Sequence, residues 1–403
     1  MSATPETLVS ARPRRPALAR IALPLLVRAF NGLEGGTLEA RLPDGSVRRF
    51  GQGPTVRLDI RDERLFARIA SHGAVGLGES YQAAEWASED LVPLLELLFR
   101  NATVGRERHP RLTKIVQARP RANRRQGLLA ARRNIAAHYD LGNDLFRLML
   151  DETMTYSCAI FDDQDEPLAD AQRRKLRRVC EKLELAPGDR VLEIGCGWGS
   201  FALVAAGEYG AHVTGLTLSA EQASFARERI AAAGLEGRIS IVEEDYRAHR
   251  GSYDKLASIE MIEAIGEKQF TTYFRAIDRF LVPDGRACVQ AILIPDERWP
   301  RYRKTPDWIE RHVFPGCLIP SLAALTGAMA HSSRLTIAGA EEIGHHYAET
   351  LRRWRERFNA AHADVRALGY DERFVRTWDF YLAVCEAGFR TRWLRDSQLV
   401  LTR

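Results

Sequence analysis

Four small polar side chains stand beside apolar residues in the run MTYSCAIF at 154–161. The run supplies the hydroxyls of Thr155, Tyr156 and Ser157 and the thiol of Cys158. These groups exchange hydrogen bonds without carrying a fixed charge. Next to a surface that excludes water, they suit a pocket that holds a small polar ligand. The run is therefore a candidate for chemistry.

A second candidate is the glycine-rich run VLEIGCGWGS at 191–200. A strand-like stretch ends there in Gly195, Gly197 and Gly199. Glycines at a strand-to-helix turn permit a positive φ and let the backbone approach a ligand, which predicts a cofactor site. A dinucleotide fingerprint needs its third glycine one residue later and an acid about twenty residues on. GLTLS at 215–219 offers hydroxyls instead, which disfavours a nicotinamide oxidoreductase.

The elements that would position these residues alternate between strand and helix from about residue 170. This pattern predicts an α/β fold, a doubly wound parallel sheet whose ligand lies at the carboxyl ends of the strands. The expected strands are RVLEIG, HVTGLTL, ISIVEED, KLASIE and ACVQAILI, and the expected helices are GSFALVAAGEYG, SAEQASFARERIAAAG and EKQFTTYFRAIDRFL.

The first third of the chain is predicted to form a smaller α+β domain. GTLEARLPDGSVRRFG alternates apolar and polar residues around a Pro-Asp-Gly turn, which predicts a hairpin. ERLFARIASHG and LVPLLELLFR have the spacing of amphipathic helices. We expect a disordered arm at 1–17, this domain at 18–105, a basic linker at 106–134 and the larger α/β domain at 135–403.

Positive charge is concentrated at the start of the chain. Residues 1–133 carry 23 Lys and Arg against 13 Asp and Glu, a net +10, and the remaining 35 against 40 give −5. A basic region of this kind suits an anionic membrane surface or a nucleic acid. The aromatic residues of a single-strand binding platform are missing, so we expect a membrane and no nucleic acid. A solvated linker is the alternative for 106–126.

The cysteine content and the hydropathy indicate which metal sites, disulfides and cellular locations to expect. Six scattered cysteines without Cys-x-x-Cys pairs argue against a zinc site or a disulfide framework, so we expect no metal. No secretion signal and no run as long as a membrane span is evident. We expect a cytoplasmic protein, peripheral on the inner face of the membrane.

Several motifs together resemble the cyclopropane fatty acyl phospholipid synthases, which are class I methyltransferases that use S-adenosylmethionine. The resemblance covers roughly 138–403 and extends loosely upstream to GLGESYQAAEW, which is similar to part of the family's lipid-associating N-terminal domain. It implies a Rossmann-like methyltransferase domain behind a lipid-associating domain. The motifs are HYDLGNDLFRLMLDETMTYSCAIF, VLEIGCGWGS, VTGLTLSAEQ, EDYR, FPGCLIPSL and FYLAVCEAGFRTR.

The resemblance implies a cofactor site at named positions. The segment around Tyr156 and Ser157 contributes to the cofactor pocket and to a small anion site beside the transferred methyl group. The remaining cofactor residues implied are Gly195, Gly197, Thr217, Ser219, Gln222, Asp245 and Tyr246. For Asp245 alone, a helix cap is an equally good interpretation.

The family's anion site is read as bicarbonate that acts as the base. It is built from a cysteine, a glutamate, a histidine, a backbone group at an isoleucine and a tyrosine. The resemblance carries four of these to Cys158, Glu263, Ile292 and Tyr381. The chain has Gln290 where those relatives have histidine.

A second departure is Glu260, which stands where relatives have glycine. Two carboxylates at 260 and 263 that face one cavity would repel each other and raise one pKa, giving a proton acceptor without bicarbonate. A cap or an arginine partner is the alternative role for Glu260. Our hypothesis is that Glu260 and Gln290 redirect the substrate cation to a second outcome, a methylene- or methyl-branched chain in place of a cyclopropane ring.

The expected function is transfer of a methyl(ene) group to the double bond of an unsaturated phospholipid acyl chain, giving a cyclopropane. The alternatives are the branched product, a small-molecule methyltransferase and a non-enzymatic lipid-binding protein. The implied partner is an unsaturated phospholipid in an anionic membrane. A homodimer and a reductase partner are both compatible with the sequence.

Overall fold

The computed structural model describes residues 30, 32–89, 91–108, 141–163 and 165–403. These fall into two compact units, one of residues 30–89 and 101–108, the other of residues 91–100 and 141–403. The predicted arm and nearly all of the predicted basic linker lie outside the described residues. The predicted domain boundary at 105 divides the chain differently, because residues 91–100 group with the larger unit.

The smaller unit contains a four-stranded sheet in the order β2-β1-β3-β4. The predicted hairpin is present, with Leu42 N donating to Ser46 O over 2.8 Å and Gly45 at a φ of 83°. A glycine takes this conformation without the steric cost of a Cβ. The elements are β1 (Gly36–Arg41), β2 (Val47–Gln52), β3 (Thr55–Ile60), α2 (Arg64–His72), α3 (Ala74–Gln82) and β4 (Trp86–Ala87), followed by α4 (Leu91–Arg108).

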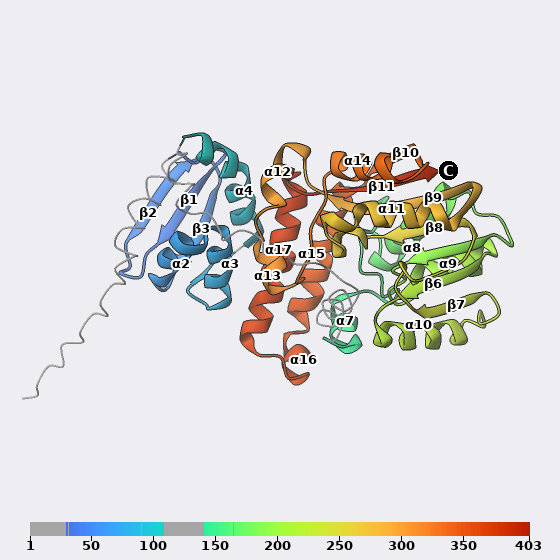
Figure 1. Ribbon diagram of the computed structural model, residues 1–403. Helices are drawn as coiled ribbons and strands as arrows, with labels where there is room; N and C mark the ends of the chain where they lie inside the picture. Colours follow the sequence, from blue (N-terminus) through green and yellow to red (C-terminus); the bar gives the residue numbers. More distant parts are fainter. Residues whose placement is uncertain (1–29, 31, 90, 109–140, 164) are drawn as a thin grey trace, which may run out of the picture. The chain divides into compact units, whose positions relative to one another are not determined.

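The larger unit is built on a seven-stranded sheet in the order β10-β11-β9-β8-β5-β6-β7 (Figure 1). All five predicted strands are confirmed and pair in parallel. They are β5 (Arg190–Ile194), β6 (His212–Thr217), β7 (Ile239–Glu243), β8 (Tyr253–Ile259) and β9 (Leu281–Leu293). The sequence did not predict β10 (Thr336–Glu342) and β11 (Arg395–Thr402), which pair antiparallel with each other and, through β11, with β9.

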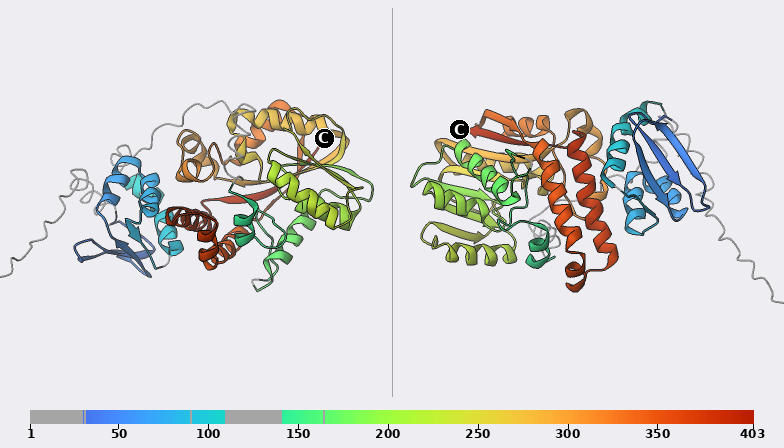
Figure 2. Two further views of the ribbon diagram at one scale, coloured as in Figure 1. Left: turned by 90° about the horizontal axis from the view of Figure 1, so that it is seen from below. Right: turned by 180° about the vertical axis from the view of Figure 1, so that it is seen from behind.

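Helices cover both faces of this sheet, as two further views make clear (Figure 2). The three predicted helices are confirmed as α9 (Ser200–Tyr209), α10 (Ala220–Ala232) and α11 (Phe270–Phe280). The others in this unit are α7 (Asn143–Met149), α8 (Leu168–Lys182), α12 (Trp299–Tyr302), α13 (Trp308–His312), α14 (Leu322–Ser332), α15 (Gly344–Ala360), α16 (His362–Ala367) and α17 (Glu372–Arg390). The predicted doubly wound α/β fold is therefore the observed one.

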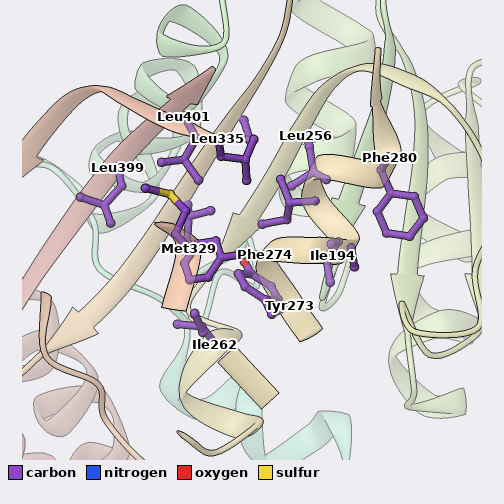
Figure 3. Packing of buried hydrophobic residues seen from close by; sticks show 14 of the residues in the cluster. Ile194, Leu256, Ile262, Tyr273, Phe274, Phe280, Met329, Leu335, Leu399 and Leu401 are labelled. Atoms are coloured by element: carbon purple, nitrogen blue, oxygen red, sulfur yellow. The ribbon is translucent and has the colours of Figure 1, made fainter. Parts of the chain in front are cut away.

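Two apolar cores hold the helices against the sheet. Successive strand residues alternate between the two cores, because side chains of a strand point to opposite faces: Leu256 belongs to one and Ala257 to the other. Figure 3 shows the first core, where Phe274 of α11 and Met329 of α14 pack with Leu256. Within the described residues, no helix is long and apolar enough to cross a membrane.

Candidate active site

A cavity opens at the carboxyl ends of β5, β6 and β8. Most of its walls come from four segments that lie far apart in the sequence and meet at this edge of the sheet. They are residues 154–157, the glycine-rich loop after β5, the end of β6 with the start of α10, and residues 259–261 after β8. The predicted cofactor residues Tyr156, Ser157, Gly195, Gly197, Thr217, Gln222, Asp245 and Tyr246 all line it.

The glycine-rich loop has the conformation that its residue types predict. Gly195 and Gly197 have φ values of 84° and 51°. A Cβ on Gly195 would come within 2.8 Å of the Cγ of Met261, whereas a Cβ on Gly197 would meet nothing within 4 Å. The first glycine is thus needed for packing and the second leaves a bare stretch of backbone at the cavity. Such a stretch suits the close approach of a ligand.

A small hydrogen-bonded group follows β6. The hydroxyl of Thr217 donates to Gln222 Oε1 over 2.9 Å, and the backbone N–H of Ser219 donates to Thr217 Oγ1 over 3.1 Å. Ser219 caps α10 by accepting from the backbone N–H of Gln222. Ser219 therefore has a local structural role, while Thr217 and Gln222 line the cavity.

Asp245 caps a local turn and also lies at the cavity. Its carboxylate forms a 2.6 Å ion pair with Arg247 and accepts from the Arg247 backbone N–H over 2.9 Å, as a turn cap does. It also lines the cavity. Its neighbour Tyr246 is buried, and burial raises the pKa of that phenol.

Ser157 is fixed by a residue that the sequence did not identify. Lys175 on α8 is fully buried, and its Nζ donates to Ser157 Oγ over 2.6 Å. Burial lowers the pKa of this ammonium, and the charges of Glu260, Cys158 and others partly offset that effect. The available signal was a lysine on the apolar stripe of α8, between Ala171 and Leu176.

The side chain of Glu260 projects into the same cavity and is bound by three donors. Its Oε1 accepts from the backbone N–H of Cys158 over 2.8 Å and from Gln290 Nε2 over 2.8 Å. Its Oε2 accepts from the hydroxyl of Tyr347 over 2.6 Å. Glu260 has a φ of 48°, a conformation that favours glycine. Its hydrogen-bond partners are therefore buried polar groups beside the cavity and not a surface arginine.

Glu263 lies behind this site. Its Oε1 accepts from the backbone N–H of Ile292 over 2.6 Å, so two positions that the resemblance assigned to one anion site contact each other directly. Burial, and then the charge of Glu260, raise the pKa of Glu263 to about 8. The expected repulsion between the two carboxylates thus acts on Glu263, which carries a proton at neutral pH.

Two predicted anion-site residues lie differently from expectation. The thiol of Cys158 points to the carbonyl oxygens of Ala159 and Ile343, so that Cys158 contacts Glu260 through its backbone N–H and not through sulfur. Burial raises the pKa of this thiol well above the ordinary value. The hydroxyl of Tyr381 contacts that of Tyr156 over 2.9 Å. The hydroxyl on Glu260 comes from Tyr347, which the sequence did not single out.

Replacing Glu263 by glutamine should remove a pH dependence of stability. Because the folded pKa of about 8 lies above the model-compound value of 4.5, the folded chain binds more protons between these pH values, and stability falls as pH rises across the window. E263Q should lack this fall, which is on the order of 5 kcal/mol. Chemical denaturation at several pH values measures it, and parallel curves for the two proteins would contradict it.

The chain is similar to known proteins of one family. The mycolic acid cyclopropane synthetase family matches residues 127–399. The tuberculostearic acid methyltransferase UfaA1 of Mycobacterium tuberculosis is 42% identical over 94% of this chain and 88% of its own. The cyclopropane-fatty-acyl-phospholipid synthase of Escherichia coli K12 is 36% identical over 85% and 87%. The mycolic acid cyclopropane synthase CmaA1, solved with SAH and CTAB, is 30% identical with a TM-score of 0.63, over 68% of this chain and 98% of its own.

Proposed function

The chain belongs to the mycolic acid cyclopropane synthetase family, and on this premise we propose that it methylates the double bond of an unsaturated acyl chain in a membrane phospholipid. It is an S-adenosylmethionine-dependent methyltransferase that acts on unsaturated lipid chains. The observation that carries the finer proposal is Glu260, a carboxylate held by three hydrogen-bond donors at the wall of the cofactor cavity.

The residues around the cavity fit the cofactor. Gly197 leaves room for a ligand against bare backbone, and Glu193 presents a buried carboxylate oxygen that has no partner among the described residues. That oxygen can accept a hydrogen bond from a ligand ammonium or hydroxyl group. Thr217 and Gln222 would bind further polar groups. S-Adenosylmethionine supplies an electrophilic methyl group there.

The protein must stabilise a positively charged acyl chain. An isolated alkene is a poor nucleophile, and its methylation leaves a carbocation that water would trap. Aromatic rings stabilise a desolvated cation by roughly 2 kcal/mol or more. Tyr156 packs with Phe146, Phe314 and Trp354 at centroid distances of 5.3, 6.4 and 5.3 Å, which supports an apolar, aromatic site beside the cofactor cavity.

The chain's own carboxylate is the base in this proposal. Bicarbonate does not fit beside Glu260, since the donors that would bind an anion, Tyr347, Gln290 and the Cys158 backbone N–H, are already used by the Glu260 carboxylate. Glu260 accepts the proton that the cation loses. Glu263, protonated at neutral pH, does not compete for it.

Two products follow from one cation, and we favour the branched one. Loss of a proton from the added methyl group with ring closure gives a cyclopropane; a hydride shift before proton loss gives an exocyclic methylene group. Glu260 and Gln290 favour the methylene product. The fixed carboxylate of Glu260 takes the place of a mobile bicarbonate, and the amide of Gln290 takes the place of the family's histidine imidazole. The 42% identical relative is named a methyltransferase, whereas the 36% identical one is named a cyclopropane synthase.

Product analysis tests the proposal. The purified protein is incubated with S-adenosylmethionine and vesicles of oleoyl phospholipid deuterated at both vinylic carbons, and the acyl chains are analysed by mass spectrometry and NMR. The hydride shift moves one deuterium to the neighbouring carbon, whereas ring closure leaves both in place. Cyclopropane as the sole product would exclude the branched outcome, and unmodified chains would exclude the function.

Binding of the protein to anionic membrane headgroups is a separate proposal. The basic first third can contribute about 1 kcal/mol per basic residue near an anionic surface. We expect flotation with anionic vesicles that high salt abolishes, and weaker flotation when the seven arginines and the lysine at 106–125 are replaced by glutamine. Binding that is equal on neutral vesicles would contradict this. A peripheral cytoplasmic location, a homodimer and a reductase partner are further proposals that this experiment leaves open.

A further inference from the structure

A buried polar network extends from Glu260 through the sheet, where apolar side chains are the rule. Asp396, Gln398 and Gln290 are each 0% exposed. Asp396 and Gln398 lie two residues apart on β11 and therefore point to the same face. Gln398 is paired directly with Gln290 of the antiparallel strand β9. The register thus brings three polar side chains together behind the cavity.

Charged groups at the two ends fix the orientation of both amides. Gln290 Nε2 donates to Glu260 Oε1 over 2.8 Å and to Asp396 Oδ2 over 2.9 Å. Its Oε1 must then accept, and it does so from Gln398 Nε2 over 3.0 Å. At the far end, Gln398 Oε1 accepts from Lys182 Nζ over 2.5 Å. Reversing either amide would set a carbonyl against a carboxylate or an N–H against the ammonium.

The carboxyl groups of Glu260 and Asp396 lie close together, because both accept from the same nitrogen, Gln290 Nε2, over 2.8 and 2.9 Å. Two ionised carboxylates buried this close would repel each other, so the pair holds one proton. Burial raises the pKa of Glu260, but its carboxyl group accepts from three donors outside the pair, which favours the ionised form of Glu260 over that of Asp396. Among the described residues, the carboxyl group of Asp396 accepts from Gln290, and its Oδ1 has no partner. The proton therefore belongs on Asp396.

We propose that Asp396 is a positioning residue that donates a shared proton to Glu260 and so holds the base ionised and correctly oriented. The proposal rests on the proposed function only in giving Glu260 the role of base. With this donor, Glu260 has four, which restrains its oxygens from attacking the substrate cation. The amide chain from Lys182 keeps Gln290 directed at both carboxyl groups.

Other groups that face this pair are consistent with one shared proton. Lys175 is the buried cation whose positive charge acts on Glu260. Glu263 and the Cys158 thiol add no negative charge at neutral pH. Tyr347 donates from α15. Burial, and then the charge of Glu260, raise the pKa of Asp396 well above its ordinary value.

Infrared difference spectroscopy of the full chain tests the shared proton without relying on activity. At neutral pH, the wild-type protein should show the carbonyl stretch of a protonated carboxylic acid that D396N lacks. E260Q should shift that band, because the acceptor changes from a carboxylate to an amide. E263Q, which removes the other buried acid, should delete its own band and leave the Asp396 band in place.

Activity provides the second measurement. An asparagine can accept from Gln290 and donate to Glu260 as the protonated acid does, so D396N should keep methyl transfer within about threefold, whereas D396L should lose tenfold or more. Wild-type and D396N spectra without a difference at neutral pH would overturn the proposal, as would wild-type activity in a folded D396L. If the wild-type protein does not methylate lipids at all, the spectra still decide the shared proton.

Discussion

Replacing Glu260 by glutamine is expected to lower the rate of methyl transfer roughly a hundredfold or more, the usual contribution of a positioned general base. Glutamine keeps the size of the side chain and can still accept from Tyr347, but it cannot take a proton. Single-turnover measurements with S-adenosylmethionine and unsaturated vesicles would separate this chemical step from binding. Cofactor affinity, measured by calorimetry, should change little.

The matched control is E263Q, which removes the neighbouring carboxyl group. Glu263 is already protonated at neutral pH, so glutamine resembles its working state and activity should stay within about threefold of wild type. If E263Q is the inactive variant and E260Q the active one, the assignment of the base is wrong. Comparable losses in both would mean that the two carboxyl groups act together.

A glycine at 260 offers a sharper test of the same idea. The left-handed φ of 48° is a conformation that glycine takes without strain, so E260G should fold. It frees the Cys158 backbone N–H, Gln290 and Tyr347 for an external anion. We expect bicarbonate to restore part of the activity of E260G and to leave the wild-type rate unchanged. Stimulation of the wild-type protein by bicarbonate would show that Glu260 does not replace it.

The strands that the sequence predicted correctly have a clear pattern of apolar residues. β5 and β8 are short apolar runs, and helices with regular spacing follow β5 and β6, so hydrophobic periodicity was sufficient. β11 escaped because its buried positions include Asp396 and Gln398, which interrupt the apolar pattern. The residues that make this strand hard to predict are the ones that connect it to the site.

The missed site residues have a related explanation. Tyr347 and Glu260 are 87 positions apart, and their contact depends on how α15 packs, which no local pattern encodes. Motif resemblance carried the tyrosine to Tyr381, which the structure pairs with Tyr156. The conformation of the glycine-rich loop, in contrast, could be predicted from its residue types, because it depends on the positive φ values that glycine permits.

Lys175 gives the prediction with the largest expected effect on stability. Its ammonium is completely buried and is attracted to Glu260 and Glu193. Removing one partner from a buried group of charges leaves the others uncompensated, which typically costs about 3–5 kcal/mol. K175M keeps a similar volume and should lower the free energy of unfolding by about 3 kcal/mol. Chemical denaturation followed by tryptophan fluorescence would measure it.

A second substitution separates charge from packing in this result. In K175M/E193Q the cation and one buried carboxyl group are both replaced, and because neutral pairs of similar volume are often tolerated, more than half of the lost stability should return. Arg177 is the control on the same helix: it is 45% exposed and pairs with Glu208, so R177M should cost less than about 1 kcal/mol. If K175M and R177M cost the same, or if E193Q restores nothing, then Lys175 contributes through packing and its charge does not balance the carboxyl groups of the site.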